Sequence, residues 1–271
     1  MSVVPSKNIV WIASYPKSGN TWMRSILQCA ATGKVSINEM FGLVPSFNDC
    51  VERVAWDKGL RSIDDPAELW VDAQRWISSL GGNRVIKTHN MRGTFCGAQH
   101  PLPELTQSAI HIVRDPRDVA VSYANHYGHS VKNAAMMLQR DDNHTRESGH
   151  PFRKAMLGSW EMNVRSWLEA PFPVLTIRYE DMLADPHDAI GKVLSFLKMK
   201  PAVPVEEIVR LTAFKKLSRM ERADGFVEKS KNQTRFFNKG TSGQWRDHKR
   251  DLEELTKTFA PLMETFGYAA D

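Results

Sequence analysis

Segment 15–22, with the sequence YPKSGNTW, gathers residue types that can hold an anion. Lys17 supplies a mobile positive charge, Ser18 and Thr21 supply hydroxyl donors, and Gly19 lets the backbone approach a ligand closely. The segment follows an apolar run and leads into a helical pattern. Such a turn directs free backbone N–H groups and the positive helix end toward one point. We predict a phosphate-binding turn here; the alternative is a basic surface turn.

A second strand-to-helix turn is expected at residues 113–122, which read VRDPRDVAVS. The Asp-Pro pair predicts a helix that starts directly after Arg114, so that Ser122 lies about two turns along it. Arginine can bind a phosphate with two parallel hydrogen bonds, and serine can add another. This pattern predicts a second phosphate site, unless Arg114 only pairs with a nearby carboxylate.

Between these turns, residues 85–90 read VIKTHN, an apolar run that ends in a lysine and a histidine. Alternate residues of a strand face the same side, so Lys87 and His89 are expected to point together. A neutral imidazole can take a proton from a hydroxyl near neutral pH, and a lysine can neutralise developing negative charge. We predict His89 as a general base; the alternative is a histidine that only makes structural hydrogen bonds.

Four short apolar runs predict the strands that carry these turns. Each run is almost continuously apolar, as a sheet buried on both faces requires. The runs are 9–13, 84–87, 109–113 and 174–178. Because helical patterns alternate with them, the sequence predicts an α/β fold: a P-loop-type three-layer fold with a central parallel sheet flanked by helices.

Helix boundaries are marked by capping residues. Asp115 and Asp185 each precede a proline and predict helix starts, and the helix after Thr21 is expected to end at Gly33. Near the C-terminus, Pro261 is expected to interrupt or restart a packed helix. Long loops or irregular helices are expected at 38–66, 90–106 and 129–156, and the polar tract 139–150 is a candidate lid.

Composition places the chain among ordinary globular proteins. With 271 residues, of which 42% are hydrophobic and 25% charged, and no shift in composition, we expect a single domain over 1–271. The apolar runs are too short to span a membrane and Met1–Asn8 lacks a signal-peptide core, so we expect a cytoplasmic protein. The three cysteines, Cys29, Cys50 and Cys96, suit reduced thiols. The formal net charge of +5 suits an anionic ligand.

Six motifs together resemble the cytosolic sulfotransferases and their bacterial relatives, over nearly the whole chain. They are YPKSGNTW at 15–22, KTH at 87–89, VRDPRDVAVSY at 113–123, YED at 179–181, LTAF at 211–214 and NKGTSGQW at 238–245. The resemblance implies a sulfotransferase that uses 3′-phosphoadenosine-5′-phosphosulfate (PAPS) as donor and releases 3′,5′-adenosine bisphosphate (PAP). It also implies a small-molecule acceptor, namely an alcohol, a phenol or an amine.

The same resemblance assigns roles to individual residues. The 5′-phosphosulfate end would be held by Lys17, Ser18, Gly19, Asn20 and Thr21. The adenine would be held by Trp22, Tyr179, Thr212 and Phe214. The 3′-phosphate would be held by Arg114 and Ser122, with Lys239 and Gly240 closing over it. His89 would be the catalytic base.

The chain departs from the family pattern at three places. Asn20 replaces a common threonine, with little expected loss because its backbone N–H remains. Asn238 stands where the family usually has an arginine for the 3′-phosphate, which weakens donor binding or shifts that role to Arg235 or Lys239. The family's dimerisation stretch is not recognisable in 246–254, so the oligomeric state stays open.

Sulfuryl transfer requires in-line positioning and stabilisation of the leaving charge, as phosphoryl transfer does. We expect His89 to remove the acceptor proton, Lys17 to stabilise the leaving phosphate oxygen and Lys87 to steady the transferring group. Lysines and backbone N–H groups supply the positive charge, so we expect no metal requirement. Acceptor walls are expected among Phe41, Phe47, Trp56, Phe95, Tyr123 and His126.

Two alternatives remain open at this level. A P-loop small-molecule kinase would share the fold, although the lysine here precedes the glycine, unlike GxxxxGK[ST]. A non-catalytic anion- or nucleic-acid-binding module would use the basic tract 229–250, although a solvated surface explains most such runs. We expect no nucleic-acid partner.

Overall fold

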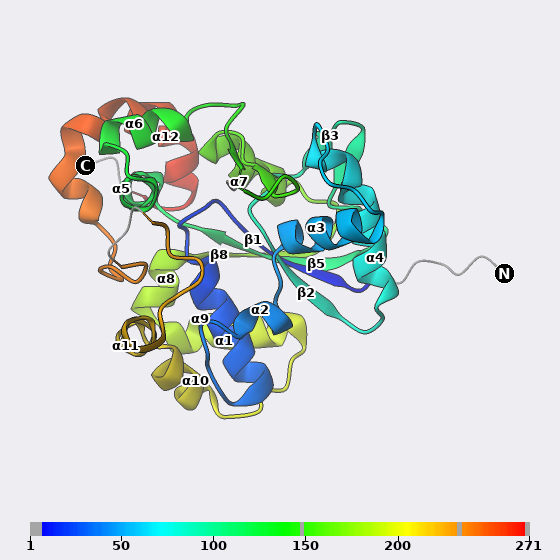
Figure 1. The fold of residues 1–271 in the computed structure, drawn as a ribbon. Coiled ribbons are helices and arrows are strands. Elements are labelled where there is room, and N and C mark those ends of the chain that lie inside the picture. Colours follow the sequence, from blue (N-terminus) through cyan, green and yellow to red (C-terminus); the bar gives the residue numbers. More distant parts are fainter. Residues whose placement is uncertain (1–6, 147–148, 232–234, 269–271) are drawn as a thin grey trace. The chain divides into compact units, whose positions relative to one another are not determined.

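The computed structural model describes residues 7–146, 149–231 and 235–268. Its central sheet has the strand order β2-β1-β5-β8 (Figure 1). The strands are β1 (Ile9–Ser14), β2 (Arg84–Thr88), β5 (Thr106–Val113) and β8 (Val174–Arg178). Helices flank this parallel sheet, so the predicted α/β fold is confirmed, and each of the four predicted strands is present. The polar tract 139–150 includes two residues, 147 and 148, outside the described ranges.

Strand β1 shows why the apolar runs were informative. All of its residues are buried. It pairs in parallel with β2, with Ile9 opposite Arg84 and Ala13 opposite Thr88. A strand covered on both faces has no solvent-facing side, so its sequence is continuously apolar rather than alternating.

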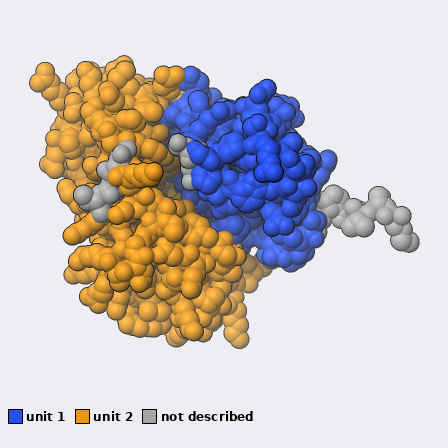
Figure 2. Space-filling model, viewed as in Figure 1, with its two compact units in different colours: residues 1–15, 44–111, 141–176 blue, residues 16–43, 112–140, 177–271 orange. Residues whose placement is uncertain are grey.

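The chain divides into two compact units (Figure 2). Unit 1 comprises residues 1–15, 44–111 and 141–176, and unit 2 comprises residues 16–43, 112–140 and 177–271. The single domain expected over 1–271 stays a prediction. No helix in the described ranges combines the length and the apolar character needed to cross a membrane.

Unit 1 is built around an aromatic core. Its elements, besides strands of the central sheet, are α3 (Phe47–Asp57), η1 (Pro66–Leu69), α4 (Trp70–Ser79), β3 (Gly93–Phe95), β4 (Ala98–His100), β6 (His144–Arg146), β7 (Lys154–Met156) and α7 (Trp160–Leu168). Trp11, Phe47 and Trp70 surround His100, with ring centroids 4.7 to 5.3 Å from that imidazole. Complete burial lowers the pKa of His100 to about 3, so the ring is neutral and packs as an aromatic.

Unit 2 is largely helical. Its helices are α1 (Asn20–Thr32), α2 (Met40–Leu43), α5 (Pro116–Tyr127), α6 (Val131–Leu138), α8 (Tyr179–Ala184), α9 (Pro186–Leu197), α10 (Val205–Thr212), α11 (Phe214–Asp224), η2 (Gln244–Leu252) and α12 (Glu253–Thr265). The predicted caps are confirmed. Helix α1 ends at left-handed Gly33, the Asp115 side chain accepts from the Arg117 N–H, and the Asp185 side chain accepts from the Asp188 N–H.

Two sequence predictions are corrected. The expectation of long loops or irregular helices is wrong for 47–57, where α3 is a regular helix, and 129–156 contains the regular helix α6. Hairpins β3–β4 and β6–β7 fill other parts of these segments. Pro261 lies inside α12 without interrupting it, because Leu255, Phe259 and Leu262 are buried along the same helix and hold it in place.

Candidate functional site

The turn between β1 and α1 is shaped to receive an anion. Gly19 is the N-cap of α1 at φ 109°, the helix has no side-chain cap, and its first turn has no acidic residue. Lys17 also has a left-handed backbone, with φ 69°, which is uncommon for a residue with a side chain. Ser18 is fully buried, and its hydroxyl has no hydrogen-bond partner among the described residues. This combination leaves donors available at a positive helix end.

Arg114 lies against this turn. One terminal nitrogen, Nη1, donates to the Lys17 carbonyl over 3.0 Å, and Nη2 donates to the Thr241 carbonyl over 3.2 Å. The guanidinium carbon is 4.4 Å from the centre of the Tyr179 ring. The side chain is buried, and its Nε has no partner within the described ranges. The structure therefore brings both predicted anion-binding turns together at one arginine.

Two glycines of the predicted site lie directly against aromatic rings. A Cβ on Gly19 would be 2.7 Å from Tyr179 Cδ2, and one on Gly240 would be 2.2 Å from Phe214 Cδ2. Both glycines have positive φ, 109° and 63°. Only glycine fits at such positions, so the sequence requirement at Gly19 and Gly240 has a steric cause. Burial raises the pKa of Tyr179, partly offset by Arg114, and the phenol stays protonated.

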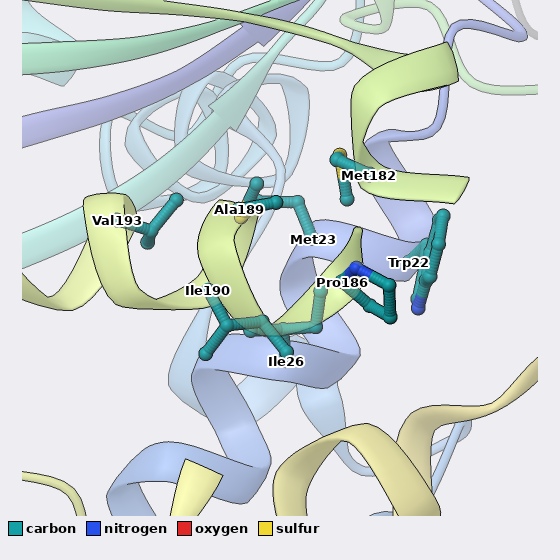
Figure 3. A pocket seen from close by; sticks show the side chains of 8 residues that line it. All are labelled: Trp22, Met23, Ile26, Met182, Pro186, Ala189, Ile190 and Val193. Carbon is teal, nitrogen blue, oxygen red and sulfur yellow. The ribbon is translucent and has the colours of Figure 1, made fainter. Parts of the chain in front are cut away.

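Trp22 borders an apolar pocket of unit 2 (Figure 3). Residues from α1, α8 and α9 line this pocket, namely Trp22, Met23, Ile26, Met182, Pro186, Ala189, Ile190 and Val193. The Trp22 ring also meets Tyr179 edge-on, with centroids 5.9 Å apart. The Trp22 ring is therefore packed among apolar side chains of α1, α8 and α9.

The other predicted adenine and 3′-phosphate residues occupy different settings. Thr212 ends α10 and uses its hydroxyl within the helix, where it donates to the Ile208 carbonyl. Phe214 begins α11 and meets Phe237 edge-on at 6.2 Å. Ser122 is half-buried on α5, and Asn238 and Lys239 are exposed. Asn20 is buried in the first turn of α1.

The ammonium of Lys17 has an aromatic neighbour that the sequence reasoning missed. Its Nζ lies 4.0 Å from the centre of the Phe236 ring and 3.4 Å from His126 Nδ1. Phe236 and Phe237 directly precede the NKG motif, which was the available signal. Their backbone N–H groups donate to the Glu221 carboxylate over 2.6 and 2.9 Å, and this contact fixes Phe236 beside Lys17.

The carboxylate of Glu228 contacts two side chains in the first turns of α1. Glu228 accepts a hydrogen bond of 3.3 Å from the Thr21 hydroxyl and pairs with Arg24 at 2.9 Å. Arg24 is fully buried, and its guanidinium lies 4.6 Å from the centre of the Phe41 ring. Thr21 therefore already shares its hydroxyl with a protein group.

His89 lies in unit 1, directly after β2. Its Nδ1 is 2.8 Å from the Ser14 carbonyl oxygen and 3.3 Å from Ser14 Oγ, and its own carbonyl accepts from the Asn163 amide. A carbonyl can only accept, so the short contact places the proton on Nδ1. In the neutral ring the lone pair is then on Nε2, which is the tautomer a general base needs.

Lys87 belongs to β2 itself, where it pairs with Ile12 and donates its N–H to the Pro45 carbonyl over 2.9 Å. Lys87 and His89 are both half-buried, and Thr88 between them is buried. Among the residues expected to line the acceptor pocket, Phe47 belongs to the core of unit 1 and is 1% exposed. Trp56, in contrast, is exposed on α3.

No group of three or more His, Cys, Asp or Glu side chains in the described part of the chain is arranged to hold a metal ion. Cys29 and Cys50 are buried and Cys96 is exposed, all as free thiols. Burial raises the pKa of Cys50 to about 12, so this thiol is protonated near neutral pH.

Comparisons with known proteins agree with one another. A family model described as a sulfotransferase domain matches residues 7–267. Sulfotransferase 1A1 of Rattus norvegicus is 30% identical, over 87% of this chain and 77% of the relative. Flavonol 3-sulfotransferase of Flaveria bidentis is 28% identical, over 92% and 80%. Cytosolic sulfotransferase 5 of Arabidopsis thaliana is 26% identical, over 91% and 76%.

A crystal structure of mouse sulfotransferase SULT7A1 complexed with PAP shares the fold, with a TM-score of 0.61 and 20% identity, over 95% of this chain and 86% of that one. A retinol dehydratase in complex with androsterone and inactive cofactor PAP gives the same TM-score and identity, over 96% of this chain and 82% of its own. These likenesses support the predicted P-loop-type architecture.

Proposed function

Because the chain belongs to the sulfotransferase family, we propose that it transfers a sulfuryl group from PAPS to a hydroxyl or amine of a small molecule, releasing PAP. The observation that carries the proposal is the junction of two anion-binding turns, where Arg114 donates to the Lys17 carbonyl over 3.0 Å. Two such turns suit a donor that carries phosphates at both the 5′ and 3′ positions. A single domain and a cytoplasmic location are part of the same proposal, supported by the span of the family model and by the cytosolic relative.

The residues of unit 2 fit the 5′ end of this donor. The buried Ser18 hydroxyl, the uncapped N-terminus of α1 and the half-buried Lys17 supply donors and positive charge at one turn. Gly19 leaves room for the Tyr179 ring beside the turn. We assign the 5′-phosphosulfate to Lys17 through Thr21, and the adenine to Trp22, Tyr179, Thr212 and Phe214.

The 3′-phosphate is assigned to Arg114, Ser122, Lys239 and Gly240. Arg114 is supported by its burial and by Nε, which has no partner among the residues described. The guanidinium is held at fixed orientation by two backbone carbonyls and the Tyr179 ring, so little entropy is lost on binding. Asn238 carries no charge for this phosphate; Lys239 and Arg235, both exposed, are the cations nearest to it in sequence.

When bound, PAPS supplies an activated sulfuryl group whose bond to the 5′-phosphate oxygen breaks as the acceptor oxygen or nitrogen bonds to sulfur. His89 Nε2 takes the proton of the acceptor nucleophile, because Nδ1 is committed to the Ser14 carbonyl. Lys17 neutralises the negative charge that develops on the leaving phosphate oxygen, and Lys87 steadies the sulfuryl oxygens.

The proposal is tested by sulfuryl transfer from PAPS labelled in the sulfuryl group to a panel of phenols, alcohols and amines. His89→Ala is expected to lower turnover about 10²- to 10⁴-fold, the usual contribution of a general base, with PAP affinity unchanged. His144→Ala, at an exposed histidine of unit 1, is the matched control and is expected to keep wild-type turnover. Near-normal turnover of His89→Ala would remove His89 from this role.

A further inference from the structure

The carboxylate of Asp118, in the first turn of α5, has no assigned role. It is 1% exposed, and both oxygens accept backbone hydrogen bonds. Oδ2 accepts from the Gly243 N–H over 2.6 Å and Oδ1 accepts from the Trp245 N–H over 3.1 Å. A buried carboxylate that accepts two backbone N–H groups has its hydrogen-bonding capacity well satisfied. Asp118 therefore ties the segment 239–245, called the strap below, to α5.

The same turn of α5 also holds the strap through an aromatic ring. The Arg117 guanidinium lies 3.6 Å from the centre of the Trp245 ring. Arg117 is itself fixed by Asp115, with Nε to Oδ1 at 3.0 Å and Nη2 to Oδ2 at 2.8 Å. Both Arg117 and Trp245 are buried. Arg117 therefore contacts the face of the Trp245 ring, while Asp118 accepts a hydrogen bond from the Trp245 backbone N–H.

Arg114 completes this attachment one turn earlier. Its Nη2 donates to the Thr241 carbonyl over 3.2 Å and lies 3.9 Å from Asp118 Oδ2. Gly240, the residue before Thr241, packs against the Phe214 ring. Asp118 is therefore placed to fix the strap and to hold the guanidinium of Arg114 by charge at the same time.

We propose that Asp118 is a positioning residue for recognition of the donor's 3′-phosphate: it docks the strap on α5 so that Lys239, Gly240 and Arg114 are arranged before the donor binds. The inference rests on the proposed function and adds to it a residue that need not touch the donor. Without this carboxylate, the Gly243 and Trp245 N–H groups turn to water, and binding must first order the strap. The resulting loss of binding affinity is confined to ligands that carry a 3′-phosphate.

The test compares calorimetric affinities for PAP and for 5′-AMP, which lacks the 3′-phosphate, in wild type and in Asp118→Asn. Asparagine keeps the size but replaces one acceptor by an N–H₂ group that faces a backbone N–H. PAP affinity is expected to fall about 10- to 100-fold, as for a lost charge-assisted hydrogen bond, and AMP affinity to stay unchanged. Asp247→Asn removes the same charge at an exposed position of η2 and is expected to match wild type for both ligands.

Gly243→Ala tests the strap from its other side. Gly243 has φ 84°, so alanine strains the turn that presents its N–H to Asp118. Gly243→Ala is expected to show the same selective loss of PAP affinity. If circular dichroism shows that Asp118→Asn is unfolded, the Gly243→Ala result alone tests the proposal. The proposal is overturned if either folded variant, Asp118→Asn or Gly243→Ala, prefers PAP over AMP as strongly as wild type does. An equal loss of affinity for both ligands is one such result. A wild type without any preference for PAP would instead contradict the proposed donor.

Discussion

Replacing Gly19 by alanine tests the close packing of the predicted phosphate-binding turn on Tyr179. The Cβ would be 2.7 Å from Tyr179 Cδ2, and φ at this position is 109°. Two separate costs follow: alanine is disfavoured at this backbone conformation, and the Tyr179 ring must move. The ring is also the one under the Arg114 guanidinium, at 4.4 Å, so its displacement disturbs the arginine as well.

The two costs can be estimated. An L-residue in a left-handed conformation costs about 1–2 kcal/mol, and forcing a methyl group into a packed site costs about 1–3 kcal/mol. The free energy of unfolding is therefore expected to fall by about 2–5 kcal/mol. PAP affinity is expected to fall about 10-fold or more, because 1.4 kcal/mol of lost contact energy corresponds to a factor of ten.

Urea unfolding and calorimetric titration with PAP measure both effects. Gly191→Ala is the matched control, since a Cβ there meets no atom within 4 Å in the middle of α9. This change is expected to raise stability by about 0.5–1 kcal/mol, as for glycine to alanine in a helix, and to leave PAP affinity unchanged. A Gly19→Ala protein with wild-type stability and affinity would refute the close packing of Gly19 on Tyr179.

Three further predictions concern stability and the donor site. Burial lowers the pKa of His111 from 6.5 to about 3. The neutral buried ring therefore contributes its full stability above pH 6.5, and the free energy of unfolding falls as the pH drops from 6.5 toward 3, by up to about 1.4 kcal/mol per pH unit. His111→Phe is expected to make the free energy of unfolding, measured by urea titration at several pH values, depend less steeply on pH in this range. Pro261→Ala is expected to raise the free energy of unfolding by about 1–3 kcal/mol, because Pro261 lies exposed inside α12 and alanine restores a helical N–H; an unchanged or lower melting temperature would contradict this. Arg114→Ala is expected to weaken PAP binding about 10- to 100-fold with AMP binding retained, and equal losses for both ligands would count against its assignment to the 3′-phosphate.

Local patterns were sufficient for the four strands of the central sheet and for the capped helix ends, but not for the two hairpins β3–β4 and β6–β7. A continuously apolar run reports burial on both faces, and an Asp-Pro pair reports a helix start, without knowledge of distant residues. Helix α3 had the same kind of signal, since Phe47, Cys50, Val51 and Val54 are buried at helical spacing, but the segment 38–66 was predicted as a long loop or irregular helices. Pro261 shows the limit of local rules, because tertiary packing of α12 outweighs the cost of a proline.

Residue types and local patterns were enough to propose site residues, but not to predict the contacts between them. Lys17, Arg114 and His89 were proposed from two turns and a strand end, and their roles stay predictions. The hydrogen bond from Arg114 to the Lys17 carbonyl joins residues far apart in sequence, and no local pattern encodes it. The two hydrogen bonds of Asp118 could not be predicted either, because a carboxylate in the first turn of a helix is common and both backbone partners come from the distant strap.

The most direct test of the account is calorimetric titration of the wild-type protein with PAP and, separately, with ATP and magnesium. The proposed sulfuryl donor predicts clear binding of PAP and no comparable binding of ATP. Preference for ATP with magnesium, or failure to bind either nucleotide, would contradict the assignment of the two anion-binding turns to a 3′,5′-bisphosphorylated donor.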